Sequence, residues 1–187
     1  MAELNPVSRF FVNLFAGRRS ARRYAWVRAH LPLAPGATCL EIGCGNGEIA
    51  ARLVDGFQPR RYVATDLDPK QVGTARAHLE GRYPGGLPQP LELRTADMLQ
   101  LPFPERSFDA VFAFTALHHA GASHRDFTGV PRALAEVDRT LRPGGFLVYE
   151  EIVHKPKFRA WLADHAYAVR ASRRRWPHDS VIAQKSS

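Results

Sequence analysis

The chain has 187 residues, of which 45% are hydrophobic and 24% are charged, and its formal net charge is +8. This length and composition predict one globular domain with a substantial core. The sequence contains no apolar run long enough to span a membrane. We also expect no signal peptide, because the apolar part of the N-terminal stretch is short and its arginines follow it.

The two cysteines of the sequence, Cys39 and Cys44, fall in one short segment. We expect the first in a strand and the second in the loop after it, so we predict no disulfide. No further cysteine or nearby histidine completes a metal-binding spacing, so we expect no metal site. Free cysteines are typical of a reducing compartment, which predicts a cytoplasmic protein.

The positive charge is concentrated at the two ends of the chain. Residues 1–30 carry six basic residues and one acid (+5), residues 31–151 carry twelve and fifteen (−3), and residues 152–187 carry eight and two (+6). A basic chain can favour nucleic acid, anionic lipid or acidic substrates, but a solvated arginine-rich surface is the simpler interpretation.

Helix-like and strand-like segments alternate along the first half of the chain. Their periodicity predicts helices over 7–30, 47–55 and 69–82, and strands over 38–42 and 60–66. Pro69 suits the first turn of the third helix, and Asp68 before it suits its N-cap.

The same alternation continues to the C-terminus. We predict strands over 91–97, 108–114 and 146–151, and helices over 130–141, ended by Pro143 and Gly144, and over 157–166. Strands over 167–176 and 180–185 should form a terminal antiparallel hairpin. The whole pattern predicts an α/β fold with a doubly wound, mostly parallel sheet.

Four notable segments lie at or directly after the carboxyl ends of the first four predicted strands. They are Gly43–Gly47, Asp66, Asp97 and Thr115–His119. Ligands of doubly wound sheets bind beyond the carboxyl ends of the strands, near the point where the strand order reverses. We therefore expect these segments to form one ligand site.

The glycine-rich segment Gly43–Gly47 lets a ligand approach the backbone closely. No Lys-Ser or Lys-Thr follows it, which excludes a P-loop. A dinucleotide motif would place a third glycine at Glu48, where a carboxylate would oppose a pyrophosphate, as would Glu41. The loop therefore favours a ligand that is not strongly anionic and can carry positive charge.

Four motifs occur in order: "LEIGCGNG", "ATDLDP", "TADMLQLPFPERSFDAVFAFTALHH" and "LRPGGFLVYEE". Together they resemble the class I S-adenosylmethionine-dependent methyltransferases, most of all the small-molecule branch with the ubiquinone and menaquinone methyltransferases. The resemblance covers residues 36–151 and, more weakly, the terminal hairpin. It implies a Rossmann-like, seven-stranded sheet whose last strand is antiparallel.

The resemblance also implies one methyltransferase domain over residues 1–187. Its parts would be an N-terminal lid helix (1–30), a cofactor-binding core (36–151), and a last helix with the hairpin (152–187). The cofactor would be S-adenosylmethionine, with S-adenosylhomocysteine as product. Ten residues match the cofactor-binding positions: Glu41, Gly43, Cys44, Gly45, Gly47, Asp66, Leu67, Asp97, Met98 and Phe114.

By the same resemblance, each of these positions has a role toward the cofactor. Asp66 would accept hydrogen bonds from both ribose hydroxyls, and Asp97 would accept one from the adenine amino group. Glu41 would organise the glycine loop and the amino end of the cofactor. The Phe114 carbonyl would accept from that amino group, and Cys44 would contribute its backbone.

Several of these positions also allow a purely structural interpretation. Leu67 and Met98 would flank the adenine ring, but both residue types also suit a core. Asp66 and Asp97 could cap the helices that follow them.

Methyl transfer is an in-line displacement that needs alignment, exclusion of water and removal of one proton. The acceptor would be a small molecule with a reactive hydroxyl, amine or carbon. His118 and His119 follow the fourth strand and are candidate bases for a hydroxyl acceptor. Alternatively, the pair belongs to the scaffold and one histidine holds the loop.

Other functions remain open on the sequence. One is RNA or protein methylation, although "FTAL" stands where the tetrapeptide of base N-methylation would be. Another is a cofactor-binding partner subunit without its own activity. We expect no nucleic-acid partner, because Arg173–Arg175 fit a solvated strand. The N-terminal helix is a lid or packed helix, or else contacts an anionic membrane. No oligomeric state follows.

Overall fold

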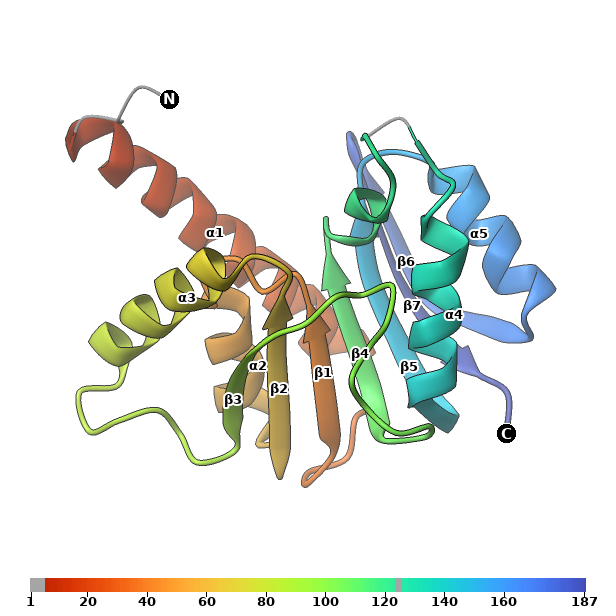
Figure 1. Cartoon of the computed structure of the whole chain (residues 1–187), viewed down its shortest axis with the longest axis horizontal. Coiled ribbons are helices and arrows are strands. Elements are labelled where there is room, and N and C mark those ends of the chain that lie inside the picture. Colours follow the sequence, from red (N-terminus) through yellow and green to blue (C-terminus); the bar gives the residue numbers. More distant parts are fainter. Residues whose placement is uncertain (1–5, 124–125) are drawn as a thin grey trace.

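The computed structural model in Figure 1 describes residues 6–123 and 126–187, with side chains from residue 17 onward. The helices are α1 (Pro6–His30), α2 (Glu48–Phe57), α3 (Pro69–Arg82), the short 3-10 helix η1 (Leu117–Ala120), α4 (Val130–Thr140) and α5 (Lys155–Asp164). The strands are β1 (Thr38–Ile42), β2 (Arg61–Asp66), β3 (Leu91–Thr95), β4 (Phe108–Phe114), β5 (Leu141–Glu151), β6 (Tyr167–Arg175) and β7 (His178–Lys185).

The strands form one seven-stranded sheet in the order β3-β2-β1-β4-β5-β7-β6. Strands β1 to β5 pair in parallel, whereas β7 runs antiparallel to both β5 and β6. The doubly wound fold, the mostly parallel sheet and the terminal hairpin are therefore confirmed. The chain direction across the sheet reverses between β1 and β4, which makes their carboxyl ends the switch point.

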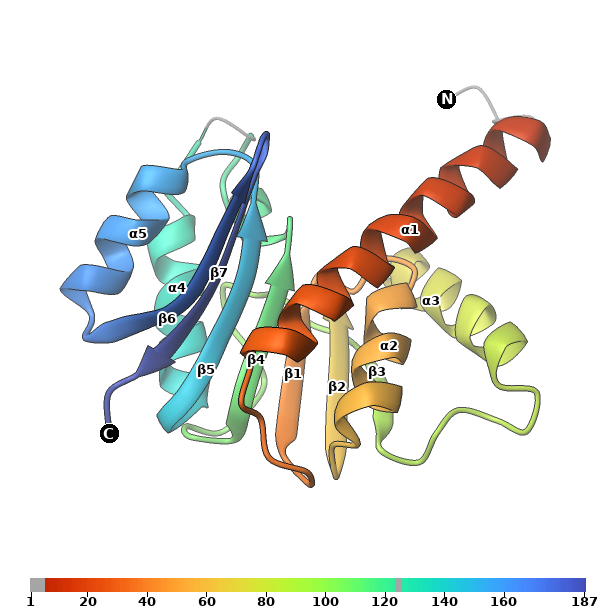
Figure 2. The ribbon, with the colours of Figure 1, turned by 180° about the vertical axis from the view of Figure 1, so that it is seen from behind.

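Helices cover both faces of this sheet. Helices α1, α2 and α3 lie on one face and α4 and α5 on the other, as the opposite views in Figures 1 and 2 show. Val27, Leu53 and Leu79 belong to the hydrophobic core on the first face, and Leu134 and Trp161 to that on the second. Central strand β4 is buried along nearly its whole length, as expected for an apolar run covered on both sides.

Strand β5 begins earlier than the sequence pattern predicts. Helix α4 ends at Thr140 and β5 starts at the next residue, so Pro143 and Gly144 lie inside the strand rather than ending the helix. The pairing moves from Phe108–Leu141 to Ala110–Phe146, and this register shift takes up the intervening residues. Proline cannot donate to a ladder, so such an irregularity accommodates it.

Smaller corrections concern other boundaries. Strand β3 ends at Thr95 rather than at 97, β7 starts at His178 rather than at 180, and α5 covers 155–164 rather than 157–166. Because β3 is shorter than predicted, Asp97 lies in a turn after the strand. The short helix η1, which holds both candidate histidines, was not predicted.

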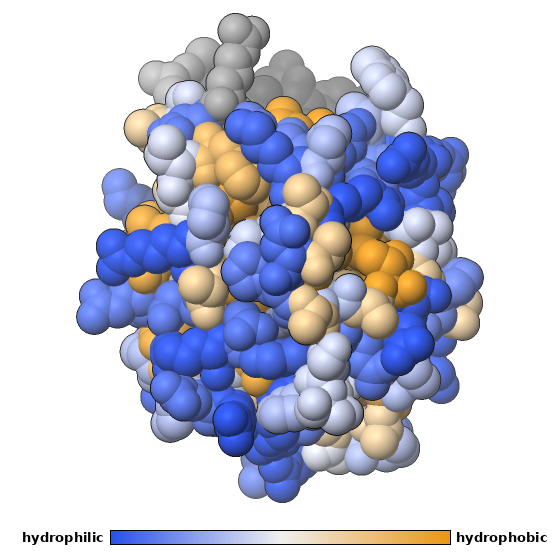
Figure 3. Space-filling view, turned by 90° about the vertical axis from the view of Figure 1, so that its right-hand side faces the viewer, coloured by the Kyte–Doolittle hydropathy of each residue, from blue (hydrophilic) through white to orange (hydrophobic). Residues whose placement is uncertain are grey.

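The surface over α4, α5 and the terminal hairpin is mixed in character. Figure 3 shows hydrophobic side chains scattered among hydrophilic ones on this face. Within the described ranges, no helix is both long and apolar enough to cross a bilayer. The side chains of residues 7–16, which form the first part of the predicted helix 7–30, lie outside the described part of the chain.

Candidate functional site

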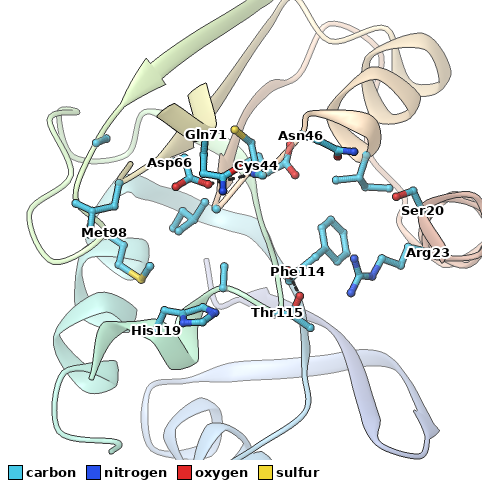
Figure 4. A pocket seen from close by; sticks show the side chains of 18 of the residues that line it. Ser20, Arg23, Cys44, Asn46, Asp66, Gln71, Met98, Phe114, Thr115 and His119 are labelled. Atoms are coloured by element: carbon cyan, nitrogen blue, oxygen red, sulfur yellow. Dashed lines mark hydrogen bonds between the residues drawn. The ribbon is translucent and has the colours of Figure 1, made fainter. Parts of the chain in front are cut away.

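A cavity of about 700 Å³ opens at the carboxyl ends of β1, β2 and β4; we call it the switch-point cavity. Figure 4 shows side chains from these strand ends and from α1 converging on it. Nine of the predicted site residues line this cavity: Glu41, Gly43, Cys44, Gly45, Asp66, Leu67, Met98, Phe114 and His119. Gly47, Asp97 and His118 are not part of its wall.

Two glycines of the loop after β1 serve different purposes. Gly43 has φ +71°, and a Cβ there would lie 2.6 Å from the Ala116 Cβ, so it lets two loops pack closely. Gly45 has φ +54°, but a Cβ there would meet nothing within 4 Å, because it faces the cavity. Close internal packing thus explains Gly43, and an approaching ligand explains Gly45. Gly47 begins α2 and packs against Leu79.

Glu41 is a buried carboxyl with one oxygen lacking a partner. The Tyr62 hydroxyl donates to Oε2 at 2.9 Å, while Oε1 makes no hydrogen bond with any residue in the described part of the chain. Burial raises the pKa of Glu41 to about 8, against the lowering effect of Tyr62 and Arg23. A buried carboxyl in this state favours a cationic ligand group that would pair with it.

Asp66 connects the end of β2 to the glycine loop. Its Oδ2 accepts from the Gly45 N–H at 3.1 Å, and its Oδ1 accepts from the Asp68 N–H at 3.2 Å. Helix α3 is capped by Asp68, which accepts from the Lys70 N–H at 2.9 Å, as the sequence predicts. Asp66 is therefore not the cap of that helix, and it remains available at the cavity wall.

Asp97 lies beside the cavity rather than in its wall. Its carboxylate is exposed, and Oδ1 accepts from the Leu99 N–H at 2.8 Å, which closes a turn. Its neighbours Ala96 and Met98 line the cavity. Any contact between Asp97 and a ligand would be at the rim.

The apolar part of the wall comes from Leu67 and Met98. Leu67 is 62% exposed, which excludes a core role for it. Met98 is partly buried, packs against the hydrophobic core and also lines the cavity. An exposed leucine beside an open cavity is suited to cover an apolar ligand face.

Phe114 ends β4 with its carbonyl already engaged. The Thr115 hydroxyl donates to this carbonyl at 2.6 Å. Thr115 itself has φ +56°, an uncommon conformation for a β-branched residue, and its N–H donates to the Glu150 carbonyl. The Phe114 carbonyl therefore has one remaining lone pair for a ligand donor.

The structure separates the two adjacent histidines. His118 is buried with Nδ1 2.6 Å from Glu151 Oε2, and the other oxygen of Glu151 accepts from the Leu117 N–H. His119 is exposed, lines the cavity and lies with its ring centroid 4.1 Å from that of His118. Only His119 has its ring at the cavity. In the described part of the chain, no cluster of three or more His, Cys, Asp or Glu could hold a metal ion.

Helix α1 contributes residues that the sequence did not identify as part of the site. Arg19, Ser20 and Arg23 close the cavity on one side. The Arg23 guanidinium lies 5.5 Å from the centroid of the Phe114 ring, and Nε donates to Glu150 Oε1 at 2.8 Å. Arg19 and Arg23 are four residues apart, so helical spacing places them on one face, a signal the sequence does contain.

Glu48 does not face the switch-point cavity. Arg52 and His78 engage its two carboxyl oxygens at 2.7 and 3.0 Å, and they hold the pKa of Glu48 below its usual value despite burial. Glu48 therefore does not oppose a pyrophosphate in the cavity. Of the two carboxyl groups predicted to disfavour an anionic ligand, only Glu41 lies in the cavity wall.

Residues 40–149 match the family described as "Methyltransferase domain", and the chain belongs to this family. It is 35% identical over 131 residues to the phthiotriol/phenolphthiotriol dimycocerosates methyltransferase of Mycobacterium leprae (70% of this chain, 43% of the relative). It is 34% identical over 134 residues to the sterol 24-C-methyltransferase ERG6B of Gibberella zeae (71% and 32%). The chain thus spans less than half the length of these curated relatives.

The fold is also similar to that of solved methyltransferase structures. The match to an S-adenosylmethionine-dependent methyltransferase from Aquifex aeolicus has a TM-score of 0.68 at 16% identity. It covers 90% of this chain and 88% of that one. At this identity the likeness is one of fold.

Proposed function

We propose that this protein binds S-adenosylmethionine in the switch-point cavity and transfers its methyl group to a small-molecule acceptor. The buried Oε1 of Glu41, which has no hydrogen-bond partner among the described residues, carries the proposal. S-adenosylmethionine has two cationic groups, an ammonium and a sulfonium, and an arriving ammonium would ionise this carboxyl and pair with it.

The remaining cavity residues suit the rest of the cofactor. Asp66 holds the loop through the Gly45 N–H and has further acceptor capacity for the ribose hydroxyls. Leu67 and Met98 provide an apolar surface for the adenine ring, with Asp97 at its rim. Gly47 would act indirectly, by shaping the loop.

S-adenosylmethionine supplies a methyl group whose bond to sulfur breaks as the bond to the acceptor forms, and S-adenosylhomocysteine leaves. The chain would align the two reactants and exclude water, with α1 as a lid. An acceptor hydroxyl also loses a proton, and we propose His119, at the cavity wall, as its base. His118 would position His119 through the buried pair with Glu151.

The acceptor we propose is a small molecule. The two relatives carry the names of enzymes for a complex lipid and a sterol, which favours a small molecule over RNA or protein. Its methylated atom is oxygen, nitrogen or carbon, a range that includes the acceptors of the ubiquinone-like branch. An open cavity lined by His119 favours an enzyme over a non-catalytic subunit.

The test is calorimetric titration with S-adenosylmethionine and S-adenosylhomocysteine on wild type, Asp66→Ala and Asp68→Ala. Losing hydrogen bonds to a charged group costs about 1.5–3 kcal/mol, so Asp66→Ala should weaken binding about ten-fold or more. Asp68→Ala removes the neighbouring carboxylate, which caps α3 outside the cavity, and should retain the wild-type affinity.

Two results would contradict the proposal. One is a folded wild-type protein that binds neither compound. The other is equal weakening by both variants, which would mean that the carboxylates act only through the fold. Binding that depends on Asp66 alone would justify a screen of acceptors for S-adenosylhomocysteine release.

A further inference from the structure

A second cavity, of about 290 Å³, lies between α1 and the β6–β7 hairpin. Its wall contains six arginines, four from α1 and two from β6: Arg18, Arg19, Arg22, Arg23, Arg173 and Arg175. The single acid in this wall is Glu150, at the end of β5. With His178 neutral, this arginine cavity has a formal charge of +5, from six guanidinium groups and one carboxylate.

The one carboxylate is already fully engaged. Arg23 Nε donates to Glu150 Oε1 at 2.8 Å, and the Ser180 hydroxyl donates to Oε2 at 2.9 Å. His178 Nδ1 also lies 3.0 Å from Oε1, and Arg173 Nη2 lies 4.0 Å from Oε2. Arg23 and Ser180 hold the pKa of Glu150 below its usual value despite burial, so it is ionised and still leaves most of the positive charge unmatched.

Some of the unmatched donors are buried. Arg23 Nη2 is 2.6 Å from the same Glu150 oxygen without being aligned as a hydrogen bond, and Arg173 Nε makes no hydrogen bond with any described residue. The Arg173 guanidinium stacks 5.1 Å above the Trp26 ring, which fixes it toward the cavity wall. Exposed arginines need no partner, but buried donors without acceptors are costly.

Two groups of this wall, Arg173 and His178, have pKa values lowered by burial and by the neighbouring cations. Burial lowers the pKa of Arg173, and Arg175 and Arg23 lower it further against the opposing effect of Glu150. The pKa of His178 is lowered by burial and by Arg23, Arg19 and Lys155, although Glu150 raises it. Each of these groups would be stabilised by an added negative charge.

We propose that the arginine cavity binds the phosphate or diphosphate group of a small molecule. Guanidinium groups match the oxygens of a phosphate in bidentate geometry, and several of them neutralise its multiple charge. The volume is at the low end for ligand pockets, which suits one anionic group rather than a whole ligand.

The position of the arginine cavity indicates which molecule carries this group. Arg19 and Arg23 line both cavities, so a bound phosphate would lie next to the switch-point cavity. This inference rests on the proposed function: the phosphorylated molecule is the methyl acceptor, and the arginine cavity holds its anionic end. The carboxylate of S-adenosylmethionine could pair with one shared arginine, but Arg173 and Arg175 line only the arginine cavity.

The test is calorimetric titration of the full chain with inorganic pyrophosphate, with and without S-adenosylhomocysteine. We compare Arg173→Gln/Arg175→Gln with Arg170→Gln/Arg174→Gln, which removes the same charge from the same strand but touches neither cavity. The first double variant should weaken pyrophosphate binding about ten-fold or more, and the second should change it little. Both should bind S-adenosylhomocysteine like wild type.

The outcomes separate this site from the proposed function. Pyrophosphate binding without S-adenosylhomocysteine binding would support the anion site and refute the methyltransferase proposal; the reverse would overturn the anion site alone. Equal weakening by both double variants, or displacement of pyrophosphate by S-adenosylhomocysteine, would also overturn it.

Further titrations identify the source of the phosphate. A soluble alkyl diphosphate and vesicles containing phosphatidic acid distinguish a soluble molecule from a lipid headgroup, and either would support the site if Arg173 and Arg175 are required. A single-stranded RNA that binds more tightly than pyrophosphate, and is weakened equally by both double variants, would replace the small-molecule assignment.

Discussion

The two cavities beside α1 differ in the charges of their walls. The wall of the switch-point cavity contains two carboxyl groups, Glu41 and Asp66, beside the two arginines Arg19 and Arg23, and one oxygen of Glu41 has no partner among the described residues. The arginine cavity has a single carboxylate facing six guanidinium groups. In the first cavity the buried, unpaired oxygen of Glu41 favours a cationic ligand group, whereas in the second the excess of guanidinium groups favours an anion.

Arg23 links these two regions. Its guanidinium pairs with Glu150, packs over the Phe114 ring, and lowers the pKa of Glu41 by charge attraction. One side chain thus contacts groups of both cavities. If both proposals hold, the anionic end of the acceptor and the cationic methyl donor would lie on either side of Arg23.

The largest expected effect comes from replacing Glu41 with glutamine, which cannot ionise. Burial raises its pKa from 4.5 to about 8, so the unfolded chain releases a proton above pH 4.5 that the folded protein retains up to pH 8. Its stabilising contribution is therefore present below pH 4.5 and is lost as the pH rises through 8. Glu41→Gln removes this loss, and the variant should exceed wild type in unfolding free energy by on the order of 3 kcal/mol at pH 8.

Denaturant unfolding between pH 5 and 8 measures this difference in unfolding free energy. Calorimetric titration measures the affinity for S-adenosylhomocysteine. The amide cannot ionise, so the stabilised variant should bind S-adenosylhomocysteine about ten-fold more weakly or worse. The control is Glu80→Gln at an exposed position, which should change neither the pH dependence nor the affinity. A Glu41→Gln protein with wild-type pH dependence would mean that the pKa of Glu41 is not raised in the free protein, and would contradict the effect assigned to its burial.

A second pair of substitutions separates the shape of the switch-point cavity from its charge. Gly43→Ala introduces a Cβ 2.6 Å from Ala116 Cβ at positive φ, and should lower the unfolding free energy by about 2–3 kcal/mol. Gly45→Ala has the same type of backbone strain but no clash, and should cost about 1 kcal/mol. Ligand titration should nevertheless show that Gly45→Ala loses S-adenosylhomocysteine affinity, because its methyl group enters the cavity. Equal stability losses would contradict the division of roles between these glycines.

Sequence reasoning was sufficient for the fold and for most of the switch-point cavity. The β-strand periodicity and the segments after each strand are local patterns, and a parallel sheet brings the carboxyl ends of its strands to one edge. Gly45, Asp66 and Met98 could therefore be placed together before the structure was known. The start of β5 was missed because the register shift opposite Asp109 accommodates Pro143 within the strand.

The arginine cavity could not be predicted in the same way. Its arginines come from α1 and β6, about 150 residues apart in the chain, and no local pattern indicates that these segments meet. The two histidines show a related limit at short range. One turn of the helix η1 directs His118 toward Glu151 and His119 toward the cavity, and adjacent identical residues carry no sequence signal for that choice.

The smallest expected effect concerns the one acid of the arginine cavity. Glu150→Gln leaves an oxygen for Arg23 or Ser180 but removes the only negative charge in that wall, and should lower the unfolding free energy by about 1–2 kcal/mol at low salt. Pyrophosphate should restore this loss by binding the folded state, and more effectively than in wild type, because the cavity has then become more positive. Thermal unfolding with and without pyrophosphate measures both effects. Glu92→Gln, which breaks the half-exposed pair with Arg61, should change stability by less than about 1 kcal/mol and show no such rescue. If pyrophosphate stabilises Glu150→Gln no more than Glu92→Gln, solvent alone neutralises the positive charge of the arginine cavity. The difference in charge between the two cavity walls would then not predict a difference between their ligands.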